Sequence, residues 1–263
     1  MSNLGNKGID FVALTEISGD DVTQEQIDRI ARRYYWAASY CDNKDVLEAA
    51  CGTGQGLGYL AKKAKSLIAG DYSRDIINIA EKHYKSRFKL QQFDAQQMPF
   101  EDQSFDVIIL FEALYYLSDY LKFFEECRRI LRKGGYLLIS TANKDLYDFT
   151  PSPHSYKYLG VRELVENLVP MGFSVDFFGD TPINDISAKQ RLLRPIKMMA
   201  SQLGLIPKSM NAKKILKKFI FGKLVTMPAE IDGMTSARIN PTRLSNNLAD
   251  KNHKVIFCAA HKL

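Results

Sequence analysis

The sequence lacks the features of an integral membrane protein, a secreted disulfide-rich protein or a metal protein. No apolar run reaches the roughly 18–20 residues of a transmembrane helix, and the N-terminal MSNLGNKGIDF has no apolar signal core. The four cysteines form no C-x-x-C pair, and the four histidines show no metal-ligand spacing. We therefore expect a cytoplasmic protein with reduced thiols and no bound metal.

Acidic residues are absent from one long segment. The chain has 263 residues and a net charge of +6, but residues 187–226 contain ten Lys/Arg and no Asp or Glu, so the remainder has a net charge of −4. A partner attracted by positive charge should therefore meet this segment. The length and the 46% apolar content fit one α/β domain with an addition.

The most informative stretch is DVLEAACGTGQGLGYLA, which starts at residue 45. It predicts a short buried strand at 46–49, a loop with four glycines and the start of a helix, and Glu48 lies near the end of the strand. The dinucleotide-binding spacing G-x-G-x-x-G fails from Gly52 and from Gly54, because Leu57 and Tyr59 stand where the third glycine would be. This spacing disfavours an NAD(P) oxidoreductase.

Four further strands follow, and carboxylates stand at the ends of two of them. The expected strands cover 66–70, 88–93, 105–111 and 136–141; Asp71 follows the first of these, and Asp94 with Ala95 follows the second. Ligands of doubly wound sheets bind at the carboxyl ends of the strands. Asp71 could therefore accept hydrogen bonds from both hydroxyls of a ribose.

Taken together, these elements resemble the class I S-adenosylmethionine (SAM)-dependent methyltransferases. The resemblance covers roughly residues 33–178 and the C-terminal strand, and it implies a Rossmann-like seven-stranded sheet with SAM as cofactor. It places Asp94 and Ala95 at the adenine. The expected cofactor-binding residues are Tyr34, Glu48, Gly52, Gly54, Asp71, Tyr72, Asp94, Ala95 and Phe111. The motif departs from many members in having Glu48 for Asp, and Ala49-Ala50 where a glycine is common.

A helix should precede this motif. Thr23 and Gln26 form a capping box that opens a helix running to about Tyr40. Its RRYYWAA segment resembles the helix in which a Tyr and an Arg close over the methionine end of SAM. The alternative is that these aromatic residues only pack the helix on the sheet.

The end of the chain predicts an insertion. A sixth strand is expected at 174–178 and an antiparallel seventh at 254–260, which leaves residues 179–253 between them. A structureless loop of that length is improbable. The methyltransferase core should therefore comprise residues 1–178 and 254–263, and residues 179–253 should form a helical lid or acceptor-binding subdomain at the active-site edge; the alternative is a packing or dimerisation element.

Residues 211–225 (NAKKILKKFIFGKLV) read as a basic amphipathic helix. Lysines gather on one face and apolar residues on the other. Such helices bind anionic partners or membrane surfaces. We therefore expect an anionic acceptor. Peripheral contact of this helix with the inner membrane face is a further possibility, and the alternative is a helix whose basic face is simply exposed to solvent.

Two residues are candidates for a catalytic base. His154 lies in a Pro-flanked loop after the fifth strand, and histidine titrates near neutrality. Glu112 follows the fourth strand directly. Tyr115 and Tyr116 should line the acceptor pocket instead. For each candidate the alternative is an ordinary surface or structural role.

The sequence thus predicts methyl transfer from SAM to a hydroxyl of a glycan-type or other small-molecule acceptor. A lipid-linked or phosphorylated acceptor fits this prediction. C-methylation of a quinone-like ring and RNA methylation are alternatives; nucleic acid is disfavoured because no RNA-binding module is recognisable. A non-catalytic binding module is a further alternative. The sequence does not indicate an oligomeric state.

Overall fold

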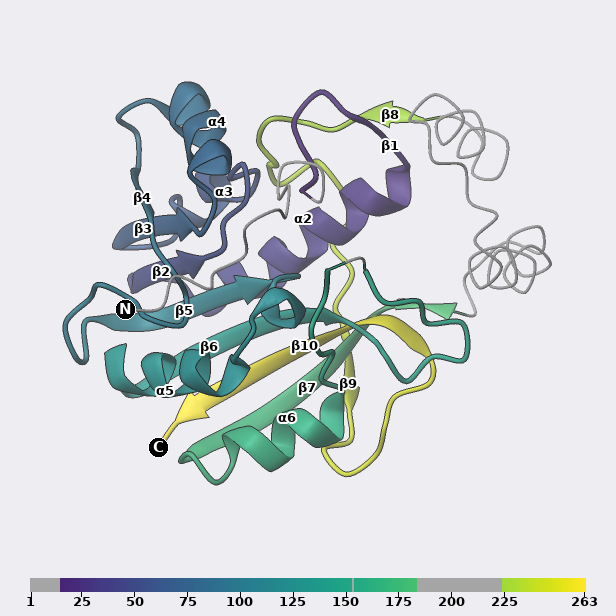
Figure 1. Ribbon diagram of the computed structural model, residues 1–263. Helices are drawn as coiled ribbons and strands as arrows, with labels where there is room; N and C mark the ends of the chain where they lie inside the picture. The colour runs from purple at the N-terminus through teal and green to yellow at the C-terminus, as the bar shows by residue number, and fades with distance from the viewer. Residues whose placement is uncertain (1–14, 153, 184–223) are drawn as a thin grey trace.

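The computed structural model describes residues 15–152, 154–183 and 224–263. Its centre is an eight-stranded sheet in the order β4-β3-β2-β5-β6-β10-β7-β9 (Figure 1). The strands are β2 (Asp45–Ala49), β3 (Ser66–Asp71), β4 (Lys89–Gln92), β5 (Phe105–Phe111), β6 (Leu131–Ala142), β7 (Phe173–Pro182), β9 (Thr242–Leu244) and β10 (His253–Lys262).

The sheet confirms the predicted topology. Strands β4, β3, β2, β5 and β6 pair in parallel, and β10 lies antiparallel between β6 and β7. The strand order reverses at β2, where β3 lies on one side and β5 on the other. Ligands of such sheets bind outside the carboxyl ends at this point.

Helices cover both faces of the sheet. The helices are α2 (Gln24–Ala38), α3 (Leu57–Leu60), α4 (Arg74–Tyr84), α5 (Tyr120–Ile130) and α6 (Val161–Leu168), with the 3₁₀ turn η1 (Leu114–Tyr116). Helices α5 and α6 pack on one face and α2 on the other, while α4 packs on β3 and β4. Successive residues of β5 belong to different cores, because a strand buried on both faces alternates its side chains.

Helix α2 begins as the sequence predicts. The Thr23 hydroxyl accepts a hydrogen bond from the Gln26 backbone N–H at 3.2 Å, and the Gln26 side-chain oxygen accepts one from the Thr23 N–H at 3.1 Å. The face that carries Ile27, Ile30, Tyr34 and Ala38 is buried, and Trp36 of this helix stacks on Phe257 of β10 with ring centroids 4.8 Å apart. The capping box and this face fix α2 across the sheet.

The region after β7 differs in part from the prediction. Strand β7 continues to Pro182, β10 begins at His253, and β9 extends the sheet by pairing with β7, so the core takes in part of residues 179–253. Residues 224–252 contain no helix; Val225 belongs to the short strand β8 (Val225–Thr226), which pairs with β1 (Asp21–Val22). A helix reaching Val225 is therefore wrong at its last two residues, Leu224 and Val225. The rest of the basic helix lies outside the described residues, and the helical insertion stays a prediction.

No helix in the described ranges is both long and apolar enough to cross a bilayer. All four cysteines are buried and free. Over the same ranges, no cluster of His, Cys, Asp and Glu has the arrangement of a metal site.

Candidate active site

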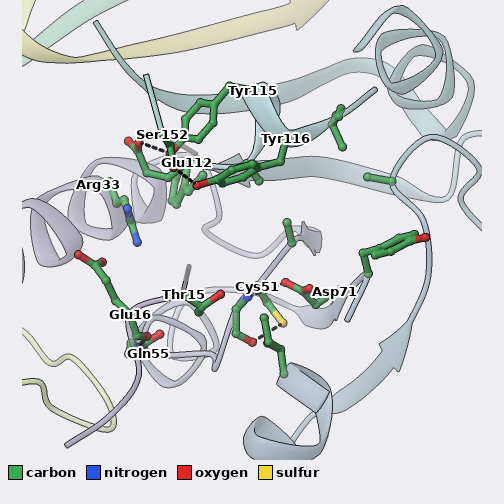
Figure 2. Close-up of a pocket in the computed structure, with 18 of the residues that line it drawn as sticks. Thr15, Glu16, Arg33, Cys51, Gln55, Asp71, Glu112, Tyr115, Tyr116 and Ser152 are labelled. Carbon is green, nitrogen blue, oxygen red and sulfur yellow. Dashed lines mark hydrogen bonds between the residues drawn. The ribbon is translucent and has the colours of Figure 1, made fainter. Parts of the chain in front are cut away.

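A cavity of about 480 Å³ lies at the carboxyl ends of the strands, as Figure 2 shows. This volume is typical of small-molecule sites. It is bounded by α2, the loops after β2, β3, β4 and β5, η1, and loop residues Thr15, Glu16, Ser152 and Tyr156. Of the predicted cofactor residues, those that line it are Tyr34, Gly52, Asp71, Tyr72, Asp94, Ala95 and Phe111.

The loop after β2 contains a run of left-handed residues. Ala50 has φ +65°, Gly52 +58° and Gly54 +86°. Gly52 lines the cavity, whereas the Gly54 carbonyl accepts a hydrogen bond from the buried Tyr84 hydroxyl at 2.5 Å. A Cβ on Gly54 would lie 2.8 Å from the Tyr84 ring. Gly54 therefore lets α4 approach the loop and is not itself part of the cavity wall.

Asp71 stands at the end of β3 and is only 8% exposed. One carboxylate oxygen accepts from the Gly52 N–H at 3.1 Å, and the other accepts from the Ser73 N–H at 3.0 Å. Burial raises the pKa of this carboxyl, and the backbone N–H donors oppose that rise. The neighbouring Tyr72 is 44% exposed at the cavity wall.

Asp94 follows β4 and is oriented by Gln96. The Gln96 backbone N–H donates to the Asp94 carboxylate at 2.8 Å, and the Gln96 side-chain amide donates to it at 3.0 Å. Ala95 is buried beside it. The carboxylates at the ends of β3 and β4 are thus both held in place at the edge of one cavity.

Glu48 lies behind Tyr34 and does not line the cavity. The Tyr34 hydroxyl donates to Glu48 at 2.5 Å, and the other Glu48 oxygen is buried without a partner. Burial raises the pKa of Glu48 to about 7, while the Tyr34 hydrogen bond and Arg33 act in the opposite direction. A Cβ on Gly56 would overlap the Tyr34 ring, so this glycine permits the close packing of α2 on the loop.

The structure separates the two candidate bases. Glu112 lines the cavity with a backbone φ of +52°; its carboxylate accepts from the Ser140 hydroxyl at 2.9 Å and from the Tyr115 hydroxyl at 3.2 Å. His154 lies in an exposed turn and is not part of the cavity wall. Tyr115 and Tyr116 do line the cavity, and the Tyr116 hydroxyl pairs with Ser152 at 2.6 Å.

Several cavity residues were not predicted from the sequence. These include Thr15, Glu16, Arg29, Cys51, Gln55, Gln96 and Ser152; Arg33 belongs to the RRYYWAA segment, for which an Arg near the methionine end of SAM was expected. The two arginines had a signal, because positions 26, 29, 30, 33 and 34 recur at the spacing of one helix face. Burial raises the pKa of the Cys51 thiol well above its usual value, so this cysteine carries no thiolate.

Residues 15–22, here called the strap, lie beside the glycine loop, and Thr15 and Glu16 line the cavity. The Gln55 side-chain amide donates to the Glu16 carbonyl at 2.6 Å. Residues 224–232 hold both the strap and the glycine loop: the Gly19 N–H donates to the Met227 carbonyl at 2.9 Å, and the Ile231 N–H donates to the Gln55 carbonyl at 2.8 Å. No local sequence pattern signals contacts between segments so far apart.

Glu230 fastens the same segment to α4 and to the loop that follows this helix. Its carboxylate accepts from Arg87 at 2.5 Å and lies 2.9 Å from the His83 ring nitrogen. The first of these interactions lowers the pKa of Glu230 most. The cover of the glycine loop therefore depends on residues 224–232, which come near the end of the sequence.

Comparisons with known proteins agree with this geometry. Residues 47–139 match the family model of the methyltransferase domain. A probable S-adenosylmethionine-dependent methyltransferase of Mycobacterium tuberculosis is 33% identical over 144 residues, covering 53% of this chain and 52% of that protein. A fatty-acid O-methyltransferase of Mycolicibacterium smegmatis is 34% identical over 114 residues, covering 41% and 42%. The chain thus spans about half the length of the curated relatives it matches.

The crystal structure of the YcgJ protein from Bacillus subtilis shares the fold, with a TM-score of 0.56 at 17% identity and coverage of 88% of this chain and 97% of that one. Residues 47–139 therefore carry a methyltransferase domain, and over about half of its length the chain is similar to proteins named as S-adenosylmethionine-dependent methyltransferases.

Proposed function

We propose that the chain transfers the methyl group of SAM to a hydroxyl of a small-molecule or glycan-type acceptor that carries a lipid or a phosphate. One observation supports this most strongly. The residues that fit SAM and a separate set of polar side chains, Glu112 with its tyrosines, line the same cavity. Cofactor and acceptor can therefore meet there without solvent between them.

The cavity fits the cofactor. Asp71, at the end of β3, would hold the ribose hydroxyls, Asp94 and Ala95 would lie at the adenine, and Gly52 leaves room for close approach to the backbone. The buried Nε–H of Arg33 has no hydrogen-bond partner, so it could donate to an oxyanion bound beside α2. When bound, SAM supplies an activated methyl group whose bond to sulfur breaks as the acceptor oxygen takes it.

Glu112 is the proposed base, and His154 remains a candidate only if its turn moves. A hydroxyl acceptor loses its proton as the new carbon–oxygen bond forms, and a carboxylate at hydrogen-bond distance can take that proton. Ser140 and Tyr115 fix the orientation of the Glu112 carboxylate. Much of the remaining acceleration comes from holding the two reactants in line.

The names of relatives favour a lipid-type acceptor within this proposal. The Mycolicibacterium smegmatis relative is a fatty-acid O-methyltransferase, and a Mycobacterium ulcerans relative acts on phthiotriol dimycocerosates by its name. Each match covers less than half of the relative's own length. An anionic acceptor and membrane contact through residues 211–225 remain predictions, and C-methylation or RNA methylation are the alternatives.

The test is methyl transfer from tritiated SAM to lipid, glycan and RNA fractions. We expect label in a lipid or glycan product. With Glu112→Gln the single-turnover rate of methyl transfer should fall about 100-fold or more, as is typical when a general base is removed. Glu166→Gln, on an exposed position of α6, is the matched control. Label in RNA alone, or an unchanged rate with Glu112→Gln, would contradict the acceptor or the base respectively; His154→Gln then decides whether the base is the histidine.

A further inference from the structure

The inner face of α2 presents two arginines to the cavity. Arg29 and Arg33 stand one turn apart, on the same face as Gln26, Ile30 and Tyr34, and all five residues line the cavity. Side chains at this spacing are neighbours, with Cβ atoms about 5–6 Å apart. Figure 2 shows Arg33 pointing into the cavity between Glu16 and Glu112.

Neither arginine has an acidic partner in the part of the chain that the structure describes. No carboxylate there lies within 4.0 Å of Arg29 or Arg33, and the buried Nε of Arg33 makes no hydrogen bond. The Arg33 guanidinium instead lies over the Phe111 ring at 5.8 Å. A guanidinium has five donors in a fixed planar fork, and leaving a buried donor unpaired is costly. The pair therefore lacks a hydrogen-bond acceptor.

The acids that face the same cavity are already engaged elsewhere. Asp71 accepts from backbone N–H groups, Asp94 from Gln96, and Glu112 from Ser140 and Tyr115. The fourth acid, Glu16, accepts from the Gln26 side chain at 3.2 Å. The nearby Tyr34, Glu16 and Glu112 raise the pKa of Arg33 against the effect of burial, so the arginine keeps its charge. Among the described residues, α2 therefore presents a buried donor to the cavity that has no acceptor.

We propose that Arg29, with Arg33 beside it, binds an oxyanion on the methyl acceptor, either a phosphate or a carboxylate. This rests on the proposed function. SAM itself has one carboxylate, which one guanidinium can bind bidentately. Arg29 lies one turn, about 6 Å, farther along α2 from Tyr34 and the glycine loop, so it is left for the acceptor.

The test uses octyl phosphate as an anionic probe and octanol as its neutral match. Both are titrated by calorimetry into the full chain saturated with S-adenosylhomocysteine (SAH), so that the carboxylate site of the cofactor is filled. We expect octyl phosphate to bind at least tenfold more tightly than octanol. Arg29→Gln should remove most of this preference and change SAH affinity less than twofold.

Arg162→Gln is the matched control, because Arg162 is exposed on α6 outside the cavity. Arg29→Lys provides a second variant: it keeps the charge but loses the fork, and we expect an intermediate preference. Equal binding of octanol and octyl phosphate would overturn the proposal. The proposal would also be overturned if Arg29→Gln weakened SAH affinity tenfold and left octyl phosphate affinity unchanged, because the arginine would then serve the cofactor. A wild-type chain that does not bind SAH would instead refute the proposed function.

Discussion

The two halves of the cavity are built differently. In the cofactor half, loop backbone turns at the ends of β2 and β3, and Asp71 is held by N–H groups of Gly52 and Ser73. In the acceptor half, side chains hold one another: Ser140 and Tyr115 orient Glu112, and Tyr116 pairs with Ser152. A site made from backbone leaves a glycine spacing in the sequence, whereas a site made from side-chain pairs does not.

The largest expected effect separates the two halves by affinity. Asp71→Ala would remove the two hydrogen bonds that we propose to the ribose, each worth about 1.5–3 kcal/mol because the acceptor is charged. SAH should bind at least 100-fold more weakly by calorimetry. Asp75→Ala, at an exposed position in the first turn of α4, is the control. Undiminished SAH affinity in Asp71→Ala would remove the assignment of this half to the cofactor.

The second prediction concerns the buried Glu48 behind Tyr34. Its pKa is raised from 4.5 to about 7 in the folded chain, so between these values the unfolded state releases the proton and the folded state retains it. Stability contributed by Glu48 is therefore present at low pH and lost as the pH rises toward 7. Relative to Glu48→Gln, the unfolding free energy of the free chain should fall by about 2–3 kcal/mol between pH 5 and 8.

Urea unfolding of both proteins at four pH values measures this difference. Because the other titrating groups are common to both proteins, their contributions cancel in the comparison. A difference that stays flat, or that grows with pH, would show that Glu48 is ionised throughout. That result would mean that the polar Tyr34 contact outweighs burial in the cofactor half.

The smallest expected effect tests the backbone of the cofactor half. Ala50 holds a left-handed φ of +65° where many methyltransferases have a glycine in this motif. Ala50→Gly relieves about 1–2 kcal/mol of strain, but it adds conformational entropy to the unfolded chain. We expect a net gain of about 0–1 kcal/mol in urea unfolding, with SAH affinity unchanged. A loss of stability would show that the methyl group packs usefully in the loop.

Most of the fold was predictable from the sequence because strands buried on both faces have continuous apolar runs. Strand β5 appears at its predicted bounds, and the seventh strand β10 lies antiparallel beside the sixth. Boundaries beyond such runs were not predictable. Strand β7 continues through Asp180 to Pro182, where pairing with β10 rather than local apolarity maintains the strand.

The candidate site was predictable where one residue follows a strand. Asp71, Asp94 and Glu112 all lie at strand ends and all line the cavity. His154 is favoured by its Pro-flanked loop after the fifth strand and by the residue type, but neither feature indicates which way its turn faces. The strap at Thr15 and Glu16 could not be predicted, because it is held through Gln55 and Met227, residues that are far apart in the chain.

The position of β10 has a consequence for synthesis on the ribosome. A nascent chain shorter than residue 253 cannot place a strand between β6 and β7, and it lacks residues 224–232 over the glycine loop until these emerge as well. The parallel strands can pair early, yet the sheet and the cover over its ligand edge are completed only after most of the sequence has been translated. Residues 47–139, which match the methyltransferase domain, are therefore translated before the sheet that contains them can be completed.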